Sequence, residues 1–412
     1  MNDNLLNTNS QTWKSCRLGD VITLKRGYDL PSNHRTEGNI PVISSSGLSG
    51  QHNVPKVQGP GVITGRYGTL GEVFFIETDF WPLNTTLYVQ SFHDNNPRFV
   101  YYLLKTLNFS NQNIAAAVPG INRNHLHEMK VVVPLLPEQR RIAHILSTLD
   151  DKIELNRRMN ATLEAMARAL FRSWFVDFDP VRAKVEGRQP AGMDEATAAL
   201  FPDAFEASEI GEIPKGWDVA SLDEIANFLN GLALQNFRPQ DGEEWLPVIK
   251  IAQLKQEKTS DCERACASIK PDCIINDGDI IFSWSGSLEV VIWCGGKGAL
   301  NQHLFKVTSS SFPKWFYYQW LLFHLDDFRT TAQNKATTMG HIQRHHLTDA
   351  KVLIPPAELL DLMSKMMNPL IGKIITLKVQ SRTLAALRDA LLPRLLSSEL
   401  SMTATATPGD VD

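Results

Sequence analysis

The chain repeats itself once, and this duplication constrains its fold more than any other feature of the sequence. Pro41-Val42-Ile43 returns as Pro247-Val248-Ile249, and Ile121-Asn122-Arg123 returns as Ile342-Gln343-Arg344. Further pairs in the same order are Trp13 with Trp217, Gly68-Thr69-Leu70 with Gly286-Ser287-Leu288, Leu83-Asn84 with Leu300-Asn301, and Tyr101-Tyr102 with Tyr317-Tyr318. The offset grows along the chain, as expected where loops have accepted insertions. The 412 residues therefore contain two diverged copies of one domain.

Each copy has the pattern of a small mixed α/β domain. Short apolar runs bounded by glycine and proline predict strands at 62–63, 73–76, 280–282 and 290–293. Pro97 and Pro313 begin helical segments that reach Leu107 and Leu325, because proline is favoured in the first turn of a helix. The apolar runs 131–133 and 352–354 predict one closing strand per copy, each followed by a proline.

A long helix is predicted after each closing strand. A seven-residue frame runs through Ile142, Leu149, Asn156, Leu163 and Leu170 in the first helix and through Met363, Leu370, Leu377, Leu384 and Leu391 in the second. Such spacing over several heptads is typical of a coiled coil, and polar residues at Asn156, Asn160, Ser381 and Arg388 interrupt it. Each apolar face could instead pack on its own domain. The matched frame favours packing of the two helices on each other.

These patterns divide the chain into six segments. We expect a first domain at 12–135, a long helix at 136–176, an acidic linker at 177–212, a second domain at 213–356, a second long helix at 357–400 and a disordered tail at 401–412. The net charge of −4 argues against a nucleic-acid partner. However, the acidic residues concentrate in the linker, whereas the segment from Trp13 to Lys130 is mildly basic.

Several kinds of protein are excluded by what the sequence lacks. No apolar run is long enough to span a membrane and the N-terminus has no signal-peptide pattern, so we expect a cytoplasmic protein. Cys262, Cys266 and Cys273 could be considered as zinc ligands, but their spacing fits no common site, and free thiols are the better interpretation. The histidines at 341, 345 and 346 also lack a metal-binding pattern.

Catalytic motifs are missing as well. Neither G-x-x-x-x-G-K-[ST] nor G-x-G-x-x-G after a strand occurs, and no nucleophile and base stand at a readable spacing. The sequence therefore predicts a binding protein that has no catalytic residue, metal or cofactor of its own.

Three stretches of the chain resemble a known family. The run Val131–Ala143 (VVVPLLPEQRRIA), the run Phe171–Pro180 (FRSWFVDFDP) and the linker motifs FPDAFE (201–206) and GEIPKGW (211–217) are similar to those of Type I restriction-modification specificity subunits. The resemblance implies an α/β (α+β) fold: two similar target-recognition domains separated by two long antiparallel coiled-coil helices.

The resemblance also implies a function and partners. Each domain is expected to read one half of an asymmetric, bipartite sequence in double-stranded DNA. Two modification subunits would methylate adenine with S-adenosylmethionine, and restriction subunits would use ATP and Mg²⁺, so these cofactors belong to partners. One alternative is a duplicated coiled-coil scaffold that binds no DNA, which the negative charge would suit. Another is an enzyme with an unusual motif.

Candidate DNA-binding residues are polar or basic side chains in the predicted loops. They are Lys25, Arg26, Tyr28, Arg66, Tyr67, Asn122, Arg123 and His125 in the first copy, and Lys250, Gln253, Lys255, Trp284, Gln302, His303, Gln343, Arg344 and His346 in the second. Arg123 and Arg344 are shared by both copies, which suits contact with phosphate. The second copy has Trp284 at the position of Arg66, so this arginine is not shared by the copies and is the better candidate for base contact.

Overall fold

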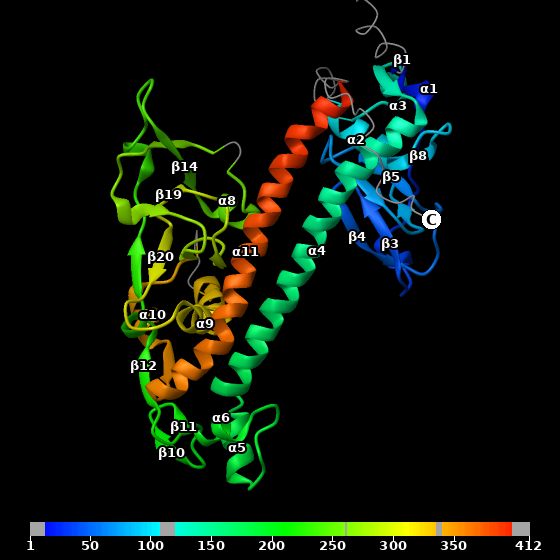
Figure 1. Cartoon of the computed structure of the whole chain (residues 1–412). Coiled ribbons are helices and arrows are strands. Elements are labelled where there is room, and N and C mark those ends of the chain that lie inside the picture. Colours follow the sequence, from blue (N-terminus) through cyan, green and yellow to red (C-terminus); the bar gives the residue numbers. More distant parts are fainter. Residues whose placement is uncertain (1–12, 108–119, 260–261, 335–339, 398–412) are drawn as a thin grey trace, which may run out of the picture. The chain divides into compact units, whose positions relative to one another are not determined.

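The computed structural model describes residues 13–107, 120–259, 262–334 and 340–397 (Figure 1). Contacts divide the chain into two compact units: unit 1 comprises residues 1–152 and 384–412, and unit 2 comprises residues 153–383. Two helices of 40 residues, α4 (Leu136–Phe175) and α11 (Ala357–Leu396), each belong partly to one unit and partly to the other.

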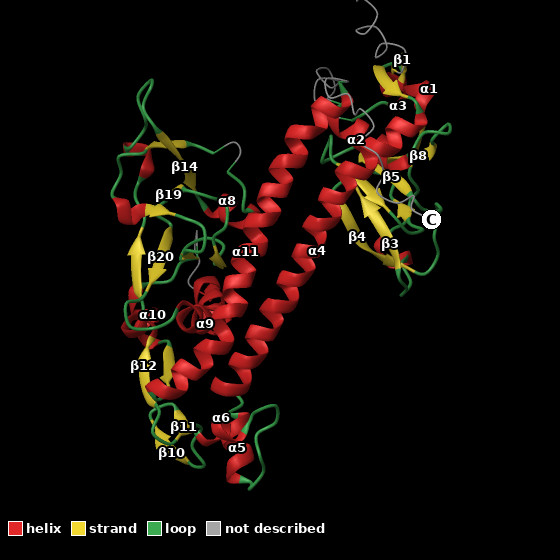
Figure 2. Ribbon diagram, in the orientation of Figure 1, coloured by secondary structure: helices red, strands yellow, loops and turns green. Residues whose placement is uncertain are grey.

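Unit 1 is built from short strands that form an antiparallel four-stranded sheet, a mixed three-stranded sheet and a separate antiparallel pair (Figure 2). The strand orders are β2-β8-β5-β6, β4-β3-β7 and β1-β9, and β3 runs parallel to β7. Its strands are β1 (Trp13–Arg17), β2 (Thr23–Arg26), β3 (Ile40–Ser44), β4 (Gly47–His52), β5 (Gly61–Gly65), β6 (Val73–Ile76), β7 (Trp81–Pro82), β8 (Thr86–Ser91) and β9 (Lys130–Pro134). Its short helices are α1 (Leu18–Val21), α2 (Pro97–Thr106) and α3 (Arg123–His127).

Helix α2 closes the core of unit 1. The Asn96 side chain accepts a hydrogen bond from the Phe99 N–H at 2.9 Å, and Pro97 occupies the first turn, so the sequence fixes where this helix begins. Its apolar face buries Phe99 and Leu103 in a cluster that also contains Ile142 of α4 and Leu395 of α11.

Gln139 explains why the Glu-Gln-Arg-Arg run stands at the start of α4. Its side chain is 3 % exposed. Its amide nitrogen donates to Asn95 Oδ1 at 2.7 Å and to the Pro134 carbonyl at 3.0 Å, and its oxygen accepts from the Asn96 N–H at 2.9 Å. A single buried amide therefore joins the end of β9, the start of α4 and the loop before α2.

Unit 2 repeats this architecture with a further strand pair. Its sheets are β13-β20-β17-β18, β15-β14-β19-β16, β12-β21 and the hairpin β10-β11, and β14 runs parallel to β19. The strands are β10 (Phe205–Ser208), β11 (Gly211–Pro214), β12 (Asp218–Ser221), β13 (Asn227–Asn230), β14 (Trp245–Ile249), β15 (Arg264–Cys266), β16 (Ile274–Ile275), β17 (Ile280–Ser283), β18 (Val290–Ile292), β19 (Gly298–Leu300), β20 (Leu304–Thr308) and β21 (Lys351–Ile354). The helices are α5 (Asp179–Val185), α6 (Glu195–Ala199), α7 (Leu222–Ile225), α8 (Ile251–Gln256), α9 (Lys314–Asn334) and α10 (Arg344–Asp349).

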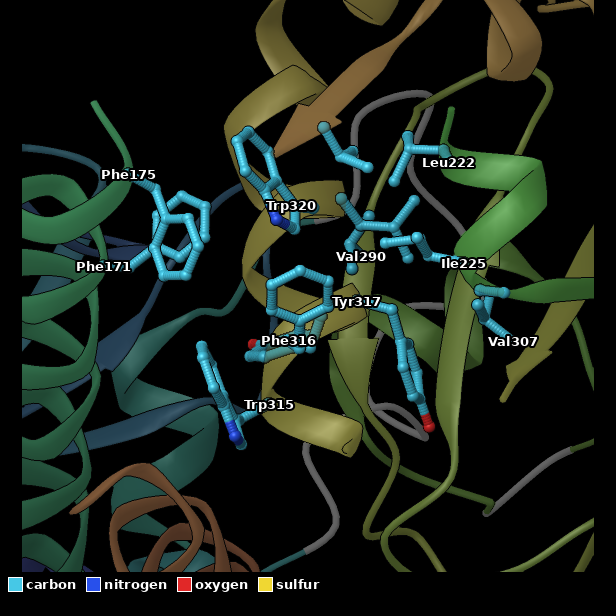
Figure 3. Close-up of a cluster of buried hydrophobic side chains, with 14 of the residues drawn as sticks. Phe171, Phe175, Leu222, Ile225, Val290, Val307, Trp315, Phe316, Tyr317 and Trp320 are labelled. Atoms are coloured by element: carbon cyan, nitrogen blue, oxygen red, sulfur yellow. The ribbon is translucent and has the colours of Figure 1, made fainter. Parts of the chain in front are cut away.

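An aromatic core joins α9 to α4 within unit 2. Figure 3 shows Trp320 and Phe316 of α9 facing Phe171 and Phe175 of α4. The Phe171 and Trp320 rings meet edge to face with centroids 4.9 Å apart. Edge-to-face pairs add to the stabilisation that burial alone provides. Helix α9 runs beyond Leu325, where the sequence pattern placed its end, to Asn334.

The acidic linker is folded rather than extended. Helices α5 and α6 and the hairpin β10-β11 all lie within residues 177–214. Val181 is fully buried and Phe201 is 2 % exposed, both in the cluster that contains Trp217. These contacts join the linker to unit 2. The predicted tail at 401–412 lies outside the described residues.

The two long helices contact each other in each unit. In unit 2, Asn156 of α4 donates to Gln380 Oε1 at 3.0 Å and to Ser381 Oγ at 3.3 Å. In unit 1, Asp150 of α4 accepts from Arg388 of α11 at 2.6 Å. As the residue number rises along α4 it falls along α11, so the helices are antiparallel.

The seven-residue frame lies on the buried stripe of both helices. Ile142, Asn156, Met363 and Leu377 are buried, and the partly buried members are Leu149, Leu163, Leu170, Leu370, Leu384 and Leu391. Two ion pairs attach α11 to loops of unit 2: Lys378 to Glu257 at 2.7 Å, and Arg382 to Asp277 at 2.6 Å. The Arg382 guanidinium holds the pKa of the Asp277 carboxyl below its usual range.

Within the described ranges, no helix is long and apolar enough to cross a membrane. The same part of the chain holds no group of three or more His, Cys, Asp or Glu side chains placed to bind a metal. None of the five cysteines, all of which the structure describes, forms a disulfide.

Candidate nucleic-acid interface

Backbone hydrogen bonds match the two copies residue by residue around one site. The Ile121 N–H donates to the Arg66 carbonyl at 2.9 Å, and in unit 2 the Ile342 N–H donates to the Trp284 carbonyl at 3.0 Å. Likewise Gly27 donates to Thr86 and Gly231 donates to Leu304. Arg66 and Trp284 therefore occupy equivalent positions in the two units.

Strand pairing corrects the sequence alignment of the copies by one residue. Sequence matched Leu83-Asn84 with Leu300-Asn301, yet Tyr28 bridges to Leu83 while its counterpart Leu232 bridges to Asn301. The recurring Leu-Asn pair is therefore out of register, because ladder hydrogen bonds rather than residue identity define equivalence in a sheet. By this register Asn84 corresponds to Gln302, and Thr85 corresponds to His303.

A basic hollow of about 530 Å³ opens on unit 1, and we call it the arginine hollow. Its lining residues are Arg26, Arg66, Tyr67, Leu87, Gly120, Ile121, Asn122 and Arg123. They come from the end of β2, the turn after β5, strand β8 and the segment that leads into α3. Five of the residues predicted from sequence thus lie together. Of the side chains that the structure places in this lining, three are guanidinium groups and none is a carboxylate.

The turn after β5 presents Arg66 and Tyr67. The backbone N–H groups of both residues donate to the Thr85 carbonyl, at 2.8 and 3.2 Å. The guanidinium carbon of Arg66 lies 4.6 Å from the centre of the Tyr67 ring, which is a cation–π arrangement. The Tyr67 ring in turn lies against Gly120, where a Cβ atom would be only 2.3 Å from the ring.

Helix α3 presents Asn122 and Arg123. Asn122 caps this helix by accepting from the Asn124 N–H at 3.0 Å, and Arg123 is exposed at the first helical residue. His127 anchors the helix, because its Nε2 accepts from the Leu24 N–H of β2 at 2.9 Å. Burial lowers the pKa of His127, and the neighbouring Arg123 charge acts in the same direction. The neutral imidazole thus connects the strand of Arg26 to the helix of Arg123.

Three predicted residues of unit 1 lie outside the arginine hollow. Lys25 and Arg26 are adjacent in β2, so their side chains point to opposite faces of the sheet. Lys25 lies 5.7 Å from the Tyr28 ring, and the Tyr28 hydroxyl bonds the Tyr88 hydroxyl at 2.9 Å. This hydrogen bond lowers the pKa of Tyr28. His125 is exposed on α3 without lining the hollow.

Unit 2 carries different side chains on the same backbone frame. We call these residues the matching surface: Asn230, Trp284, Ser285, Gln302, His303 and His341. The Trp284 indole N–H donates to Asn230 Oδ1 at 3.1 Å, and its ring centre lies 5.9 Å from that of His303. His303 Nδ1 bonds Ser285 Oγ at 3.0 Å, and His303 Nε2 lies 3.4 Å from the Gln302 amide nitrogen. An acceptor role for Nε2 towards Gln302 requires the neutral imidazole protonated on Nδ1.

The remaining predictions for unit 2 fall in two other places. Lys250, Gln253 and Lys255 lie at α8, where Lys250 pairs with Glu263 and Lys255 lies 3.8 Å from Glu289. Gln253 accepts from the Lys250 N–H at 3.3 Å.

At helix α10, Arg344 donates to the Phe228 carbonyl at 3.3 Å. Gln343 is exposed at the N-cap of this helix, and His346 Nδ1 accepts from the Gln343 N–H at 2.9 Å. Of the residues predicted in unit 2, Trp284, Gln302 and His303 lie together, and the Arg344 guanidinium lies 5.7 Å from the ring of Phe305, whose centre is 5.9 Å from that of Trp284.

Sequence reasoning missed six residues of the two surfaces: Leu87, Gly120 and Ile121 in unit 1, and Asn230, Ser285 and His341 in unit 2. Tyr67 and Gly120 form a β-bridge, and Ser285 and His341 form the equivalent one. The repeat contained a usable signal for Asn230, because it follows Arg26 by the same offset that separates Trp13 from Trp217.

A family model described as "Type I restriction modification DNA specificity domain" matches residues 10–165 and 214–383. The chain belongs to this family. Both copies are matched, so each unit contains one specificity domain. Members of the family are specificity subunits of Type I restriction-modification systems, and catalysis resides in their partner subunits.

The relatives include two named specificity subunits. The Type I restriction enzyme MjaIX specificity subunit of Methanocaldococcus jannaschii is 27 % identical over 73 % of this chain and 68 % of its own length. The HindI specificity subunit of Haemophilus influenzae is 23 % identical over 68 % of this chain and 71 % of its own length. The crystal structure of the S subunit from M. genitalium has a TM-score of 0.56 over 98 % of this chain and 99 % of that one, at 16 % identity. This likeness confirms the predicted mixed fold with two long helices.

Proposed function

We propose that this chain recognises an asymmetric, bipartite sequence in double-stranded DNA, with one half read by each unit. The observation that carries the proposal is the pair of surfaces described above. One backbone frame holds arginines and a tyrosine in unit 1, and tryptophan, histidines and amides in unit 2. Because the two sets of side chains differ in hydrogen-bonding pattern, the two halves of the sequence should differ as well.

Charge and shape support duplex DNA as the ligand. The arginine hollow gathers three guanidinium groups, which suit phosphate oxygens and the acceptors of guanine. Its walls come from turns and a helix start, and backbone and side-chain donors at such places commonly contact DNA. The net charge of −4 does not oppose this proposal, because unit 2 includes the folded acidic segment 177–212.

We further propose that two modification subunits bind this chain and methylate adenine with S-adenosylmethionine. Restriction subunits would add ATP- and Mg²⁺-dependent translocation and cleavage. The long helices α4 and α11 are the parts of the chain that we expect these partners to contact. In this proposal S-adenosylmethionine, ATP and Mg²⁺ bind to the partner subunits, and this chain supplies sequence recognition.

The test is to purify the chain alone and together with its modification subunit, and to incubate each with duplex DNA and S-adenosylmethionine. We expect methylation only with the complex, at adenines inside one asymmetric sequence split by a fixed gap. Binding should weaken as salt concentration rises, because phosphate contacts release counterions. Methyl transfer by the isolated chain, or equal binding of the complex to unrelated duplexes, would contradict the proposal.

A further inference from the structure

The arginine hollow offers almost only hydrogen-bond donors. Arg26, Arg66 and Arg123 have no acceptor atom. Asn122 already uses its side-chain oxygen to accept from the Asn124 N–H. None of the side chains shown lining the hollow is a carboxylate. A base read here should therefore present acceptors.

Arg66 is held in place through both its backbone and its side chain. Its backbone N–H donates to the Thr85 carbonyl at 2.8 Å, and its own carbonyl accepts from Ile121 at 2.9 Å. Its guanidinium carbon lies 4.6 Å from the centre of the Tyr67 ring, over the ring. Across the described residues Arg66 has no ion-pair partner. A planar fork fixed in this way loses little entropy when it forms two parallel hydrogen bonds.

The position of the Tyr67 ring depends on Gly120, because a side chain at 120 would meet the ring. Unit 2 has the reverse arrangement. There the small residue Ser285 occupies the turn, and the facing segment supplies a ring, His341. At the place of Arg66 stands Trp284, whose only donor is already bonded to Asn230. At this position, among the described residues, unit 1 therefore has a guanidinium fork without an ion-pair partner and unit 2 does not.

We infer that Arg66 contacts a guanine in the half of the sequence read by unit 1, with Tyr67 and Gly120 as positioning residues. This inference rests on the proposed function. Guanine is the base that presents two acceptors, O6 and N7, side by side in the major groove, and a guanidinium bonds both. Adenine places a donor beside its N7, cytosine presents a donor, and thymine has a single acceptor next to its methyl group.

The experiment uses the complex with modification subunits and a duplex carrying its mapped methylation sequence. Each guanine is replaced in turn by 7-deazaguanine, which lacks the N7 acceptor. We expect one position, in one half of the sequence, at which this replacement weakens binding by roughly tenfold, the usual size of a bidentate base contact. Arg66→Ala should weaken binding to the intact sequence by a similar factor and lose its response to 7-deazaguanine at that position.

Two further variants separate positioning from charge. Gly120→Ala should reduce the 7-deazaguanine response without altering the salt dependence of binding, because no charge is lost. Arg66→Lys keeps the charge but lacks the fork, so it should also lose discrimination at that base pair.

Arg123→Ala is the matched control. It should weaken binding to every duplex and flatten the salt dependence, yet retain the full 7-deazaguanine response. The inference is overturned if no guanine responds in the wild-type complex, or if Arg66→Ala and Arg66→Lys respond as the wild type does. If instead the wild-type complex binds scrambled and mapped sequences equally, the proposed function itself fails.

Discussion

At the scale of single residues, the same fold position serves different purposes in the two units. The site at Arg66 and Trp284 shares its backbone hydrogen bonds and differs in chemistry. In contrast Arg123 and Arg344 are identical in type but differ in surroundings, because Arg344 donates to a backbone carbonyl whereas Arg123 lines the hollow. Identity between repeats is therefore not evidence of identical contacts, and the phosphate role of Arg344 stays a prediction.

His127 makes unit 1 sensitive to acid. Its folded-state pKa is lowered, so its contribution to stability is complete above the unfolded pKa of about 6.5 and is lost as pH falls from there through the folded value. Protonated Nε2 cannot accept from the Leu24 N–H. As pH falls below about 6.5, the protection of the Leu24 amide against hydrogen exchange, measured relative to the intrinsic exchange rate at each pH, should therefore decrease.

His127→Gln has no titrating group at this position, so the protection of its Leu24 amide should change less with pH than in the wild type. His125→Gln on the same helix is the control and should behave as the wild type. Equal pH responses of His127→Gln and wild type would show that another group is responsible.

Arg66, Tyr67, Asn122 and Arg123 were predicted from sequence as polar or basic residues of loops between apolar strands. The structure brings these four residues together in the lining of one hollow, and their contact with DNA stays a prediction. Lys25 and Arg26 were predicted as basic residues of a loop, whereas both lie in strand β2, where neighbouring side chains point to opposite faces. Ser285 and His341 could not be predicted, because a small residue comes to face a ring here only through the pairing of two segments that are distant in the sequence.

At the scale of elements, the sequence predicts those helices whose apolar residues recur at a regular spacing. Heptad spacing predicts α4 and α11 because each turn repeats the same packing requirement. The linker offered no such repeat. Its burial depends on isolated residues, Val181 and Phe201, packed in a cluster completed by Trp217 from another segment. The one-residue error at Leu83 has a similar origin, because strand register depends on the partner strand and cannot be read from one strand alone.

Asp150 joins three helices of unit 1. Its carboxylate accepts from Tyr102 of α2 at 2.7 Å and from Arg388 of α11 at 2.6 Å, while the residue itself lies on α4. Asp150→Ala leaves the Tyr102 hydroxyl without this acceptor and leaves the mostly buried Arg388 guanidinium paired with Asp389 alone. Hydrogen bonds to charged groups contribute about 1.5–3 kcal/mol, so the free energy of unfolding should fall by about 2 kcal/mol.

Asp151→Ala provides the control for that measurement in denaturant unfolding. Asp151 is the next residue and makes an exposed ion pair with Arg98. Exposed pairs contribute about 1 kcal/mol or less. If the two substitutions cost the same, the buried carboxylate is not the link that we describe.

At the scale of the whole molecule, each specificity domain should be exchangeable. Strand β1 pairs with β9 from Trp13↔Pro134 to Arg17↔Lys130, so the exchanged segment must include both strands. Replacing Trp13–Pro134 by the same region of a relative should change one half of the methylated sequence and leave the other as it was. Mapping methylated adenines before and after the exchange measures this. A change in both halves would mean that the units read jointly.

The length of the two long helices should set the gap between the two halves of the recognised DNA sequence. Seven residues added to each helix keep the heptad and lengthen it by about 10 Å, or about three base pairs at roughly 3.4 Å each. Insertion after Leu155 and after Thr383 leaves Asn156 opposite Ser381 and keeps Arg382 on Asp277. Insertion after Leu377 would instead move Lys378 and Arg382 away from Glu257 and Asp277.

An active double-insertion variant should methylate a sequence with a longer gap. Inserting the heptad in α4 alone is the control, because it breaks the pairing between the helices and should cost stability. Should the active variant still methylate at the original gap, helix length does not set the spacing. The added base pairs also rotate one half of the sequence about the DNA axis, and this rotation alone can inactivate a variant. The gap is therefore measured in variants that still methylate DNA.

Unit 1 is assembled from two segments that are far apart in the sequence, and this affects how it folds during translation. Leu392 and Leu395 of α11 belong to the same buried cluster as Leu18, near the other end of the described chain. On the ribosome, residues up to Lys152 emerge first, yet the helix that completes their core follows some tens of seconds later at roughly 5–20 residues per second. Unit 2 is one continuous segment and needs no such wait. The specificity domain that is translated first is therefore the last to complete its core. A nascent chain that ends before α11 leaves this core incomplete, and chaperones and proteases act on such chains.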